Sequence, residues 1–417
     1  MERLNLDKFK ILAAAVTLAM FAGTACAETE LYGQINRTIT HFDDSRDQGT
    51  LFSDNSFAPS MLGVKSMAHV NKCVTVGGVL EAQMSPNSAR MVSQLRQTEL
   101  GSNIMFVNRA DVWASAGVWG KFSLGYGDPA SMGITRMSYA RTGDTVSSSR
   151  VENLAGGLHF HTQGSVNRVV APTATTAGTP VVSMLFNSID GVGSFDLSGK
   201  FNQKNRVRWD SDKWNGLSLA VSHGSVQERV TSTTDFTDVD PITRSYTDAA
   251  LRYEGSFDDF MVSAGLGLGY YTRDSLATED NVTTTGANRG QKLWAGSVAA
   301  EHKPTGFNAA FSYGNKRKMI PALNNQKSWF AQVGKHFSWM HYGKTNLAID
   351  FFKGTNVLTN IDNSKSFGFG VVQDLDKANS SVYATVRNYK YNTNATTKYD
   401  TIKVAAVGFM FKFGAML

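Results

Sequence analysis

From residue 30 to the end of the chain, hydrophobic and polar residues alternate in segments of about ten residues. A period of two is typical of a β-strand with one face in apolar and the other in polar surroundings. About ten residues is the length that a tilted strand needs to cross the hydrocarbon layer of a membrane. The pattern predicts sixteen strands, at 30–42, 60–70, 73–85, 104–116, 119–126, 204–210, 215–226, 245–256, 259–271, 291–302, 306–316, 327–338, 344–353, 365–375, 380–391 and 401–413.

The alternation also predicts which side chains share a face. In segment 259–271 the even positions from Phe260 to Tyr270 are apolar, whereas Ser263, Gly265, Gly267 and Gly269 occupy the opposite face. Segment 401–413 places Ala405, Val407, Phe409, Phe411 and Phe413 on one face. The phase of segments 291–302 and 327–338 is ambiguous, so their orientation stays open.

The connections alternate between short and long. Short turns lie at 71–72, 117–118, 211–214, 257–258, 303–305, 339–343 and 376–379, and long polar stretches lie at 43–59, 86–103, 127–203, 227–244, 272–290, 317–326, 354–364 and 392–400. An even-stranded barrel with short turns at one end and long loops at the other has this connectivity. Closure matters because an open sheet edge in lipid leaves backbone groups without partners. The fold class predicted is all-β, a 16-stranded antiparallel transmembrane β-barrel.

Aromatic residues and composition support the barrel. Aromatic side chains gather at the short-turn ends, where they form a girdle at the membrane interface: Trp119, Trp209, Trp214, Phe257, Phe260, Phe307, Phe337, Trp339 and Phe413. No segment after residue 27 has the roughly 18 consecutive apolar residues of a membrane helix, which excludes a helical membrane protein. A soluble β-sandwich is the alternative, but it does not require two classes of loop length.

Residues 1–27 have the features of a cleaved signal peptide. Lys8 and Lys10 precede an apolar run from residue 11 to residue 25, and Ala25-Cys26-Ala27 supplies the small residues of a cleavage site. Residues 28–417 then form the barrel. Cleavage removes three basic and two acidic residues, so the net charge falls from +6 to +5. One cysteine, Cys73, remains, and no disulfide forms within a single chain.

Three segments resemble the general porins of proteobacteria. Residues 31–37 (LYGQINR) look like the first strand of that family, 109–125 (RADVWASAGVWGKFSLG) resembles the strands leading into its constriction loop, and 206–222 (RVRWDSDKWNGLSLAVS) is similar to the hairpin after that loop. The resemblance implies a trimer of barrels in the outer membrane, in contact with its lipid. It implies further that each barrel is a water-filled channel for passive diffusion of small hydrophilic solutes and ions. It also implies that the third loop, residues 127–203, folds inward as a constriction.

The sequence departs from the family in two places. Segment 127–203 is longer than a constriction loop usually is, and it includes Val169–Val182 (VVAPTATTAGTPVV), so part of 165–203 is either constriction loop or surface excursion. Porins of this kind usually end on Phe, whereas here Phe413 is followed by four residues. Because Phe413, Ala415 and Leu417 keep one phase, the final strand is expected to continue to the terminus.

In a narrow aqueous passage, selectivity comes from charged groups on inward strand positions and on the inward loop. The predicted wall residues are Arg109, Arg206, Arg208, Arg252 and Lys121, with Lys65 as a weaker candidate. The loop contributes Asp128, Asp144 and Glu152, and also carries Arg136, Arg141 and Arg150. The arginines of the wall favour a weak anion preference. If the three acids line the passage alone, the preference is for cations.

Arg37 shares the predicted outer face with Ile35 and Ile39, where an arginine at mid-bilayer costs roughly 2–4 kcal/mol. A first strand that faces another subunit explains it, which favours a homotrimer.

No other pattern carries chemistry. His159 and His161 lack a third metal ligand, 193–200 (GSFDLSGK) lacks the spacing of a phosphate loop, and Asp43, Asp44 and Asp47 are expected to be a solvated acidic loop. There is no G-x-S-x-G motif. We therefore predict no enzyme activity, no cofactor, no bound metal and no nucleic-acid partner. Two alternatives stay open, a substrate-specific channel and a surface adhesin or antigen that acts through its loops.

Overall fold

The computed structural model describes residues 27–96, 105–163, 180–186, 188–192, 204–229, 241–273, 289–317, 324–393 and 398–416. The predicted signal peptide lies outside these residues except for Ala27. Among the described residues, no helix is long and apolar enough to cross a membrane.

The described residues form seventeen strands in one sheet. The strands are β1 (Ala27–Asp43), β2 (Gln48–Asp54), β3 (Met61–His69), β4 (Val74–Met84), β5 (Met105–Ala116), β6 (Lys121–Gly127), β7 (Lys204–Asp210), β8 (Leu217–Arg229), β9 (Pro241–Phe257), β10 (Phe260–Arg273), β11 (Arg289–His302), β12 (Phe307–Lys316), β13 (Gln326–Met340), β14 (Gly343–Thr355), β15 (Asn363–Leu375), β16 (Ser380–Asn392) and β17 (Ile402–Met416). The short helices are η1 (Gly117–Trp119), η2 (Val151–Asn153), α2 (Val182–Leu185) and η4 (Asp376–Ala378).

The extra strand, β2, comes from a segment that was predicted to be a loop. Residues 43–59 contain β2, which pairs with Arg37–Asp43 of β1, whereas β3 pairs with Ala27–Gln34 of the same strand. β2 and β3 therefore share one position in the wall, one above the other. The seventeen strands fill sixteen positions, as the alternation predicts.

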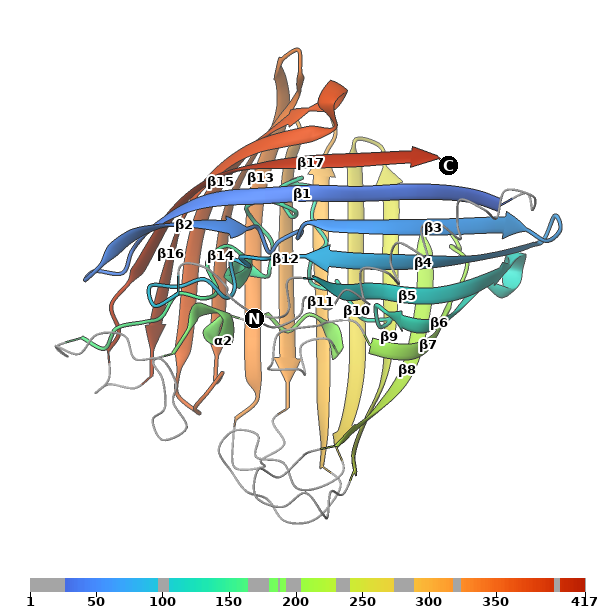
Figure 1. Ribbon diagram of the computed structural model, residues 1–417, viewed down its shortest axis with the longest axis horizontal. Coiled ribbons are helices and arrows are strands. Elements are labelled where there is room, and N and C mark those ends of the chain that lie inside the picture. The colour runs from blue at the N-terminus through green and yellow to red at the C-terminus, as the bar shows by residue number, and fades with distance from the viewer. Residues whose placement is uncertain are drawn as a thin grey trace, which may run out of the picture.

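The wall is closed. β1 pairs with β17 in antiparallel register from Glu30 opposite Met416 to Asp43 opposite Lys403, and Figure 1 shows these two strands side by side with the sheet curving round from them. The pairing reaches Met416, so the last strand continues past Phe413 as the phase of its side chains indicates. The predicted fold class, a closed sixteen-stranded antiparallel barrel, is confirmed.

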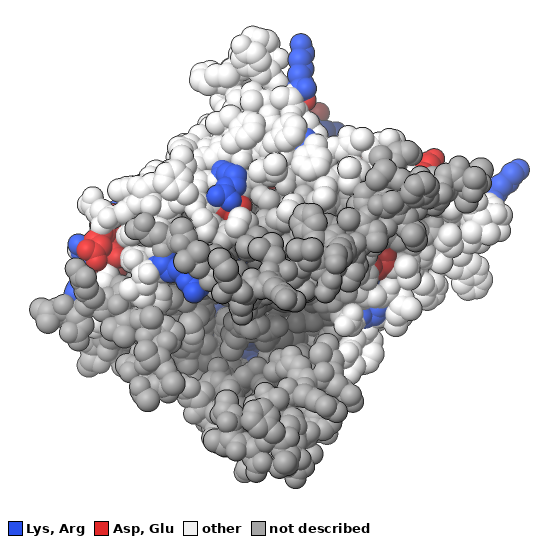
Figure 2. Space-filling model, in the orientation of Figure 1, with Lys and Arg blue, Asp and Glu red and all other residues white. Residues whose placement is uncertain are grey.

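One face of the strands is apolar and exposed, and the other is polar and largely buried. Val298 and Val333 are about half exposed, whereas Ser297 and Gln332, their neighbours in sequence, are buried. This pattern settles the two ambiguous segments: even residues of β11 and odd residues of β13 face outward. Most of the described surface in Figure 2 carries neither acidic nor basic side chains. The apolar face is suited to lipid, and the polar face encloses the interior.

The short turns contain residues that tolerate left-handed backbone. In the turn between β7 and β8, Asn215 (φ 48°) and Gly216 (φ 85°) both have positive φ. Two such residues in succession match the right-handed twist of flanking antiparallel strands. Trp119 and Trp214, at this end of the barrel, are 75% and 72% exposed, as expected for an interfacial girdle.

Candidate functional site

After β6 the chain runs along the polar face of the wall, and we call its described residues 128–163 the first pass. The Ala130 backbone N–H donates to Ser222 Oγ of β8 over 2.9 Å, and Ser131 Oγ donates to Asp248 Oδ2 of β9 over 2.6 Å. Ser297 Oγ of β11 donates to the Ile134 carbonyl over 2.6 Å. The beginning of the first pass is therefore hydrogen-bonded to three strands, β8, β9 and β11.

The first pass continues past β13 to the seam between β17 and β1. Ser138 Oγ donates to Gln332 of β13 over 2.5 Å, and Asn36 Nδ2 of β1 donates to the Asp144 carbonyl over 3.2 Å. Tyr389 OH of β16 donates to the Val151 carbonyl over 2.7 Å. The contacts extend over most of the circumference from β8 to β1.

The chain then returns, and residues 180–192, except 187, form the second pass. Ser364 Oγ of β15 donates to the Leu185 carbonyl over 2.7 Å, and the Ile189 N–H donates to Ser328 Oγ of β13 over 3.0 Å. The two passes are tied together by an ion pair of 2.8 Å between Arg136 and the buried Asp190. Segment 180–192 thus lies against the same part of the wall as the first pass.

The inner face of the wall carries glycines where the passes lie closest to it. Gly265, Gly267 and Gly269 face inward on β10, and a Cβ built on Gly265 or Gly269 would lie within 2.7 Å of Ile134 or Val192 side-chain atoms. A larger side chain needs the space that the loop occupies. This contact explains the small-residue face that the sequence shows in 259–271.

Apolar residues replace polar ones on the inner face where the passes cover it. One buried cluster joins Leu158, Phe160 and Phe186 of the two passes to strand residues that include Phe352 and Tyr389. The Phe186 and Tyr389 rings meet edge to face with centroids 5.1 Å apart. Such packing holds the two passes in a defined position against the wall.

Three of the predicted wall arginines hold the beginning of the first pass. Arg206, with its side chain 3% exposed, donates through Nη2 to Asp111 Oδ2 over 2.6 Å and through Nε to the Asp128 carbonyl over 2.7 Å. Arg208 donates to the Asp128 carbonyl and pairs with Asp210. Arg252 donates to the carbonyls of residues 130 and 132.

The arginine side chains place positive charge in the interior, but most of these groups have partners within the wall. Arg206 and Arg208 each have a carboxylate partner within the wall. Arg109, 34% exposed, lies 3.5 Å from Asp111. Lys121 Nζ lies 4.9 Å from the centre of the Trp113 ring, and Lys65 pairs with Glu30 at 2.8 Å.

The acidic candidates do not form one cluster. Asp128 contributes its backbone carbonyl to the arginines of β7. Asp144, 62% exposed, pairs with Lys412 of β17 at 3.2 Å. Glu152 is buried and pairs with Arg150 at 3.2 Å. The structure thus places Asp128 with the wall arginines and separates Asp144 and Glu152 from them.

A buried ion pair on the opposite part of the wall was not predicted. Arg387 of β16 and Asp350 of β14 form two N–O contacts of 2.6 and 2.7 Å, and both side chains are 0% exposed. Arg387 also donates to the Val146 carbonyl, and Ser147 Oγ donates to Asp350. Strand phase places Arg387 on the inner face, but its partner is 37 residues away in sequence, so the alternation alone could not reveal the pair.

Several charged groups outside the strands have shifted pKa values. Burial and, to a smaller extent, the nearby Arg150 charge lower the pKa of Arg90 to about 10. For Asp190, burial acts to raise the pKa, but Arg136 and hydrogen bonds from Thr135 outweigh it and lower the pKa below the ordinary value. Both groups therefore stay charged at neutral pH, Arg90 as a cation and Asp190 as an anion.

The other candidates have structural partners. His161 Nε2 lies 3.1 Å from Asp44 Oδ2, and both side chains are buried. No group of three or more potential metal ligands occurs in the described part of the chain. Residues 193–200 lie outside the described residues, and Cys73 is exposed.

A closed barrel that is apolar outside and polar inside, with a segment laid along its interior, defines an outer-membrane channel protein. The family comparison agrees with this class, because a family model described as Gram-negative porin matches residues 13–394. The chain belongs to the Gram-negative porin family. The resemblance found in its strands is thereby confirmed, as are the outer-membrane location and the function as a passive channel.

Solved structures share the fold at low sequence identity. The anion-selective porin from Comamonas acidovorans aligns with a TM-score of 0.55 at 13% identity, covering 93% of this chain and 100% of that one. OmpT of Vibrio cholerae in a trimer form aligns with a TM-score of 0.55 at 13% identity, covering 93% of this chain and 99% of that one. OmpF of Salmonella typhi in complex with daunomycin aligns with a TM-score of 0.54 at 13% identity, covering 92% of this chain and 97% of that one. No curated protein matches the chain in sequence.

Proposed function

We propose that the first and second passes are the constriction of this porin and that the passage beside them prefers anions. The observation that carries the proposal is the charge left exposed on the first pass. Arg141 is exposed, and Arg136 is exposed beside its buried partner Asp190, whereas Glu152 is buried and the exposed Asp144 has Lys412 as its partner. Cationic groups that remain in contact with water raise the local concentration of anions.

The inner face of the wall also carries charge of the same sign. Arg109 and Arg252 are half-buried, so parts of their guanidinium groups remain accessible beside Lys121. Arg206 is less suited to this role because its charge is buried against Asp111. Neutralising Arg206 and Arg208 would therefore disturb the beginning of the first pass as well as the field. The anion-selective porin from Comamonas acidovorans has the same fold, which supports the proposal only at the level of architecture.

Reversal potentials in planar bilayers under a KCl gradient test the proposal. The wild-type channel is expected to prefer chloride. Arg141→Gln is expected to lower the chloride-to-potassium permeability ratio, because Arg141 is exposed and has no hydrogen bond or ion pair with another described residue. Lys72→Gln, at an exposed short turn, removes the same charge outside the passage and is the matched control. A cation-preferring wild-type channel would overturn the selectivity and leave the porin assignment intact.

We also propose that the protein is a homotrimer that conducts passively and has no enzyme activity. OmpT of Vibrio cholerae, which shares the fold, has been solved as a trimer. Arg37 no longer supports this argument, because it pairs with Asp54 of its own chain at 2.6 Å. Native mass spectrometry of the protein folded in detergent measures the stoichiometry, and a stable monomer would contradict the trimer.

A further inference from the structure

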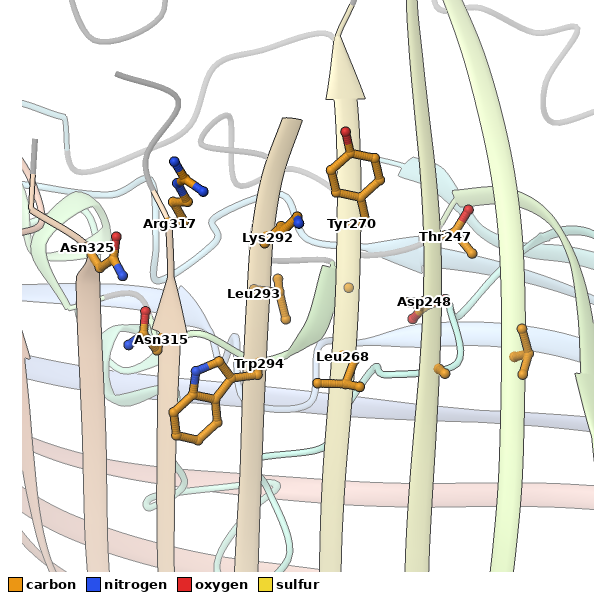
Figure 3. Close-up of a pocket in the computed structure, with 13 residues that line it drawn as sticks. Thr247, Asp248, Leu268, Tyr270, Lys292, Leu293, Trp294, Asn315, Arg317 and Asn325 are labelled. Carbon is orange, nitrogen blue, oxygen red and sulfur yellow. The ribbon is translucent and has the colours of Figure 1, made fainter. Parts of the chain in front are cut away.

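Lysine side chains lie over aromatic rings on both faces of the wall. The pairs are Lys65 with Tyr32, Lys121 with Trp113, Lys292 with Tyr270 and Lys335 with Phe307. The last two are on the outer face, where rings and lysines mark the membrane interface. Figure 3 shows Lys292 and Tyr270 there, on neighbouring strands. The first two are on the inner face, which is ordinarily polar in a barrel that holds water, so their rings need a separate explanation.

The Trp113 ring of β5 lies flat against the inner face of the wall. A Cβ built on Gly77 of β4 would lie 2.6 Å from Trp113 Cε2, so one face of the indole rests on the neighbouring strand. The other face is turned to the interior, where Lys121 Nζ lies 4.9 Å from the ring centre. Phe352 and Tyr389, also on the inner face, are fully buried against the passes, whereas Trp113 and Lys121 are only half-buried. The indole is therefore accessible from the passage.

The polar groups of Trp113 and Lys121 are not used by the wall. Lys121 is directly opposite Asp210 of β7, but Asp210 accepts hydrogen bonds from Arg208 Nη2 over 2.6 Å and from Arg208 Nε over 2.9 Å. Within the described part of the chain, Lys121 Nζ has no hydrogen bond or ion pair, and Trp113 Nε1 has no acceptor. The pair therefore presents an ammonium group, an indole N–H and an aromatic face to a solute in the passage.

The pair of Lys65 and Tyr32 has the same arrangement, but its polar groups are engaged. A Cβ built on Gly63 of β3 would lie 2.7 Å from Tyr32 OH, so this ring also rests on a glycine of the neighbouring strand. Tyr32 OH donates to Glu81 Oε2 over 2.8 Å, and Lys65 pairs with Glu30 at 2.8 Å. Partners within the wall thus account for this pair, which makes it a comparison for Trp113 and Lys121.

We propose that Trp113 and Lys121 form a binding site for aromatic carboxylates that pass through the channel. Lys121 pairs with the carboxylate at the edge of the indole, and the planar ring of the solute stacks on the indole face. A saturated carboxylate makes the charge contact without the stacking. The site is on the short-turn side of the first pass, because Trp113 is opposite Ser123 and the pass begins at residue 128. The inference rests on the proposed anion preference, since the passage must admit the carboxylate.

The test compares benzoate with cyclohexanecarboxylate as blockers of the KCl current through the full protein in planar bilayers at neutral pH. Benzoate is expected to half-block the wild type at a concentration about fivefold lower, because only its ring stacks on the indole. Trp113→Leu should make the two concentrations equal, whereas Trp113→Phe should keep most of the difference. Lys121→Gln should raise both concentrations about threefold, because both acids lose the same ion pair.

The matched control is Lys65→Gln, which removes a lysine over an inner-face ring whose charge already has a partner, and it should leave both half-blocking concentrations unchanged. Heat-modifiable mobility checks folding, and if Trp113→Leu does not fold, the wild type and Lys121→Gln decide the question. Equal block by the two acids in the wild type, a difference that survives Trp113→Leu, or equal effects of Lys65→Gln and Lys121→Gln would each overturn the site. A cation-preferring reversal potential in KCl alone would instead overturn the proposed anion preference.

Discussion

The ion pair between Arg387 and Asp350 is the most deeply buried charge interaction between described residues of the wall. Removing one partner leaves the other as an uncompensated charge, which costs about 3–5 kcal/mol. We therefore expect Arg387→Gln to lower the unfolding temperature markedly. Because Arg387 also donates to the Val146 carbonyl, the same variant should increase the current noise of single channels.

The double variant Arg387→Gln/Asp350→Asn distinguishes the cost of an uncompensated charge from the cost of lost packing. Removing both charges abolishes the uncompensated carboxylate, so the double variant is expected to recover most of the lost stability. Thermal unfolding of the three proteins in one detergent measures this. An Arg387→Gln protein as stable as the wild type would contradict the cost assigned to the uncompensated charge.

At the scale of single residues, alternation predicted orientation well and interaction partners poorly. It placed Arg206 and Arg208 on the inner face, where the structure has them. It could not show that Asp111, 95 residues from Arg206, neutralises that charge, because the pairing depends on the order of strands around the barrel. For the same reason the predicted set included Glu152, which is buried, and missed Arg387.

At the scale of elements, the contact between β10 and the first pass has a direct test. A Cβ on Gly267 would lie 3.1 Å from Ser131 Cβ and 3.3 Å from Ile134 Cγ1, so the remainder of a leucine side chain must displace the first pass. Gly267→Leu is expected to change single-channel conductance without preventing barrel formation.

Gly78→Ala on β4 is the matched control for this substitution. Its Cβ would meet its nearest atom at 3.5 Å, an ordinary contact. This variant should conduct like the wild type. Wild-type conductance in Gly267→Leu would mean that the first pass does not limit the current.

The hairpin between β1 and β2 holds the far end of the first pass through Asp44. Asp44 Oδ1 accepts from the Asp47 N–H over 2.7 Å, and Oδ2 accepts from Gln94 over 2.8 Å and lies 3.1 Å from His161 Nε2. Burial acts to raise the pKa of Asp44, but these hydrogen bonds and the His161 charge lower it below the ordinary value. The folded state therefore binds the proton less tightly than the unfolded chain does.

This shift predicts a pH-dependent attachment. A lowered pKa adds stability that is complete above the ordinary carboxyl pKa of about 3.9 and is lost as the pH falls through the folded-state value. Asp44→Asn is expected to cost about 1–3 kcal/mol at pH 7, and its difference from the wild type should shrink below pH 4. Unfolding midpoints at pH 7, 4 and 3 measure both effects. A difference that grows at low pH would contradict the lowered pKa.

The sequence predicted most elements within a few residues, because each strand has a strong alternation of its own. β2 was missed because it lies in a stretch of turn-forming residues and pairs only with the C-terminal part of β1, Arg37–Asp43. The two passes could not be foreseen in detail, since their positions depend on hydrogen bonds to nine or more strands that are distant in sequence. Long loops have no period from which such contacts follow.

At the scale of the whole molecule, buried charges hold the structure together, and exposed charges are available to select ions. Arg206, Arg208 and Arg387 are paired with carboxylates and hold the passes, whereas Arg141 is exposed on the first pass, as is Arg136 beside its partner Asp190. Only the exposed charges are strongly screened by salt, because the Debye length falls from about 10 Å at 0.1 M to about 3 Å at 1 M. If the exposed charges set the selectivity, the selectivity must depend on ionic strength.

We therefore expect the chloride-to-potassium permeability ratio to approach that of the free ions as the mean KCl concentration rises from 0.1 to 1 M. Reversal potentials measured at one fixed concentration gradient, centred on each mean concentration, give the two ratios. Arg141→Gln should reduce the ratio at 0.1 M and have little effect at 1 M, because the charge it removes is already screened there. A ratio that does not change with salt would show that the exposed charges do not set the selectivity, because their field is strongly screened at 1 M.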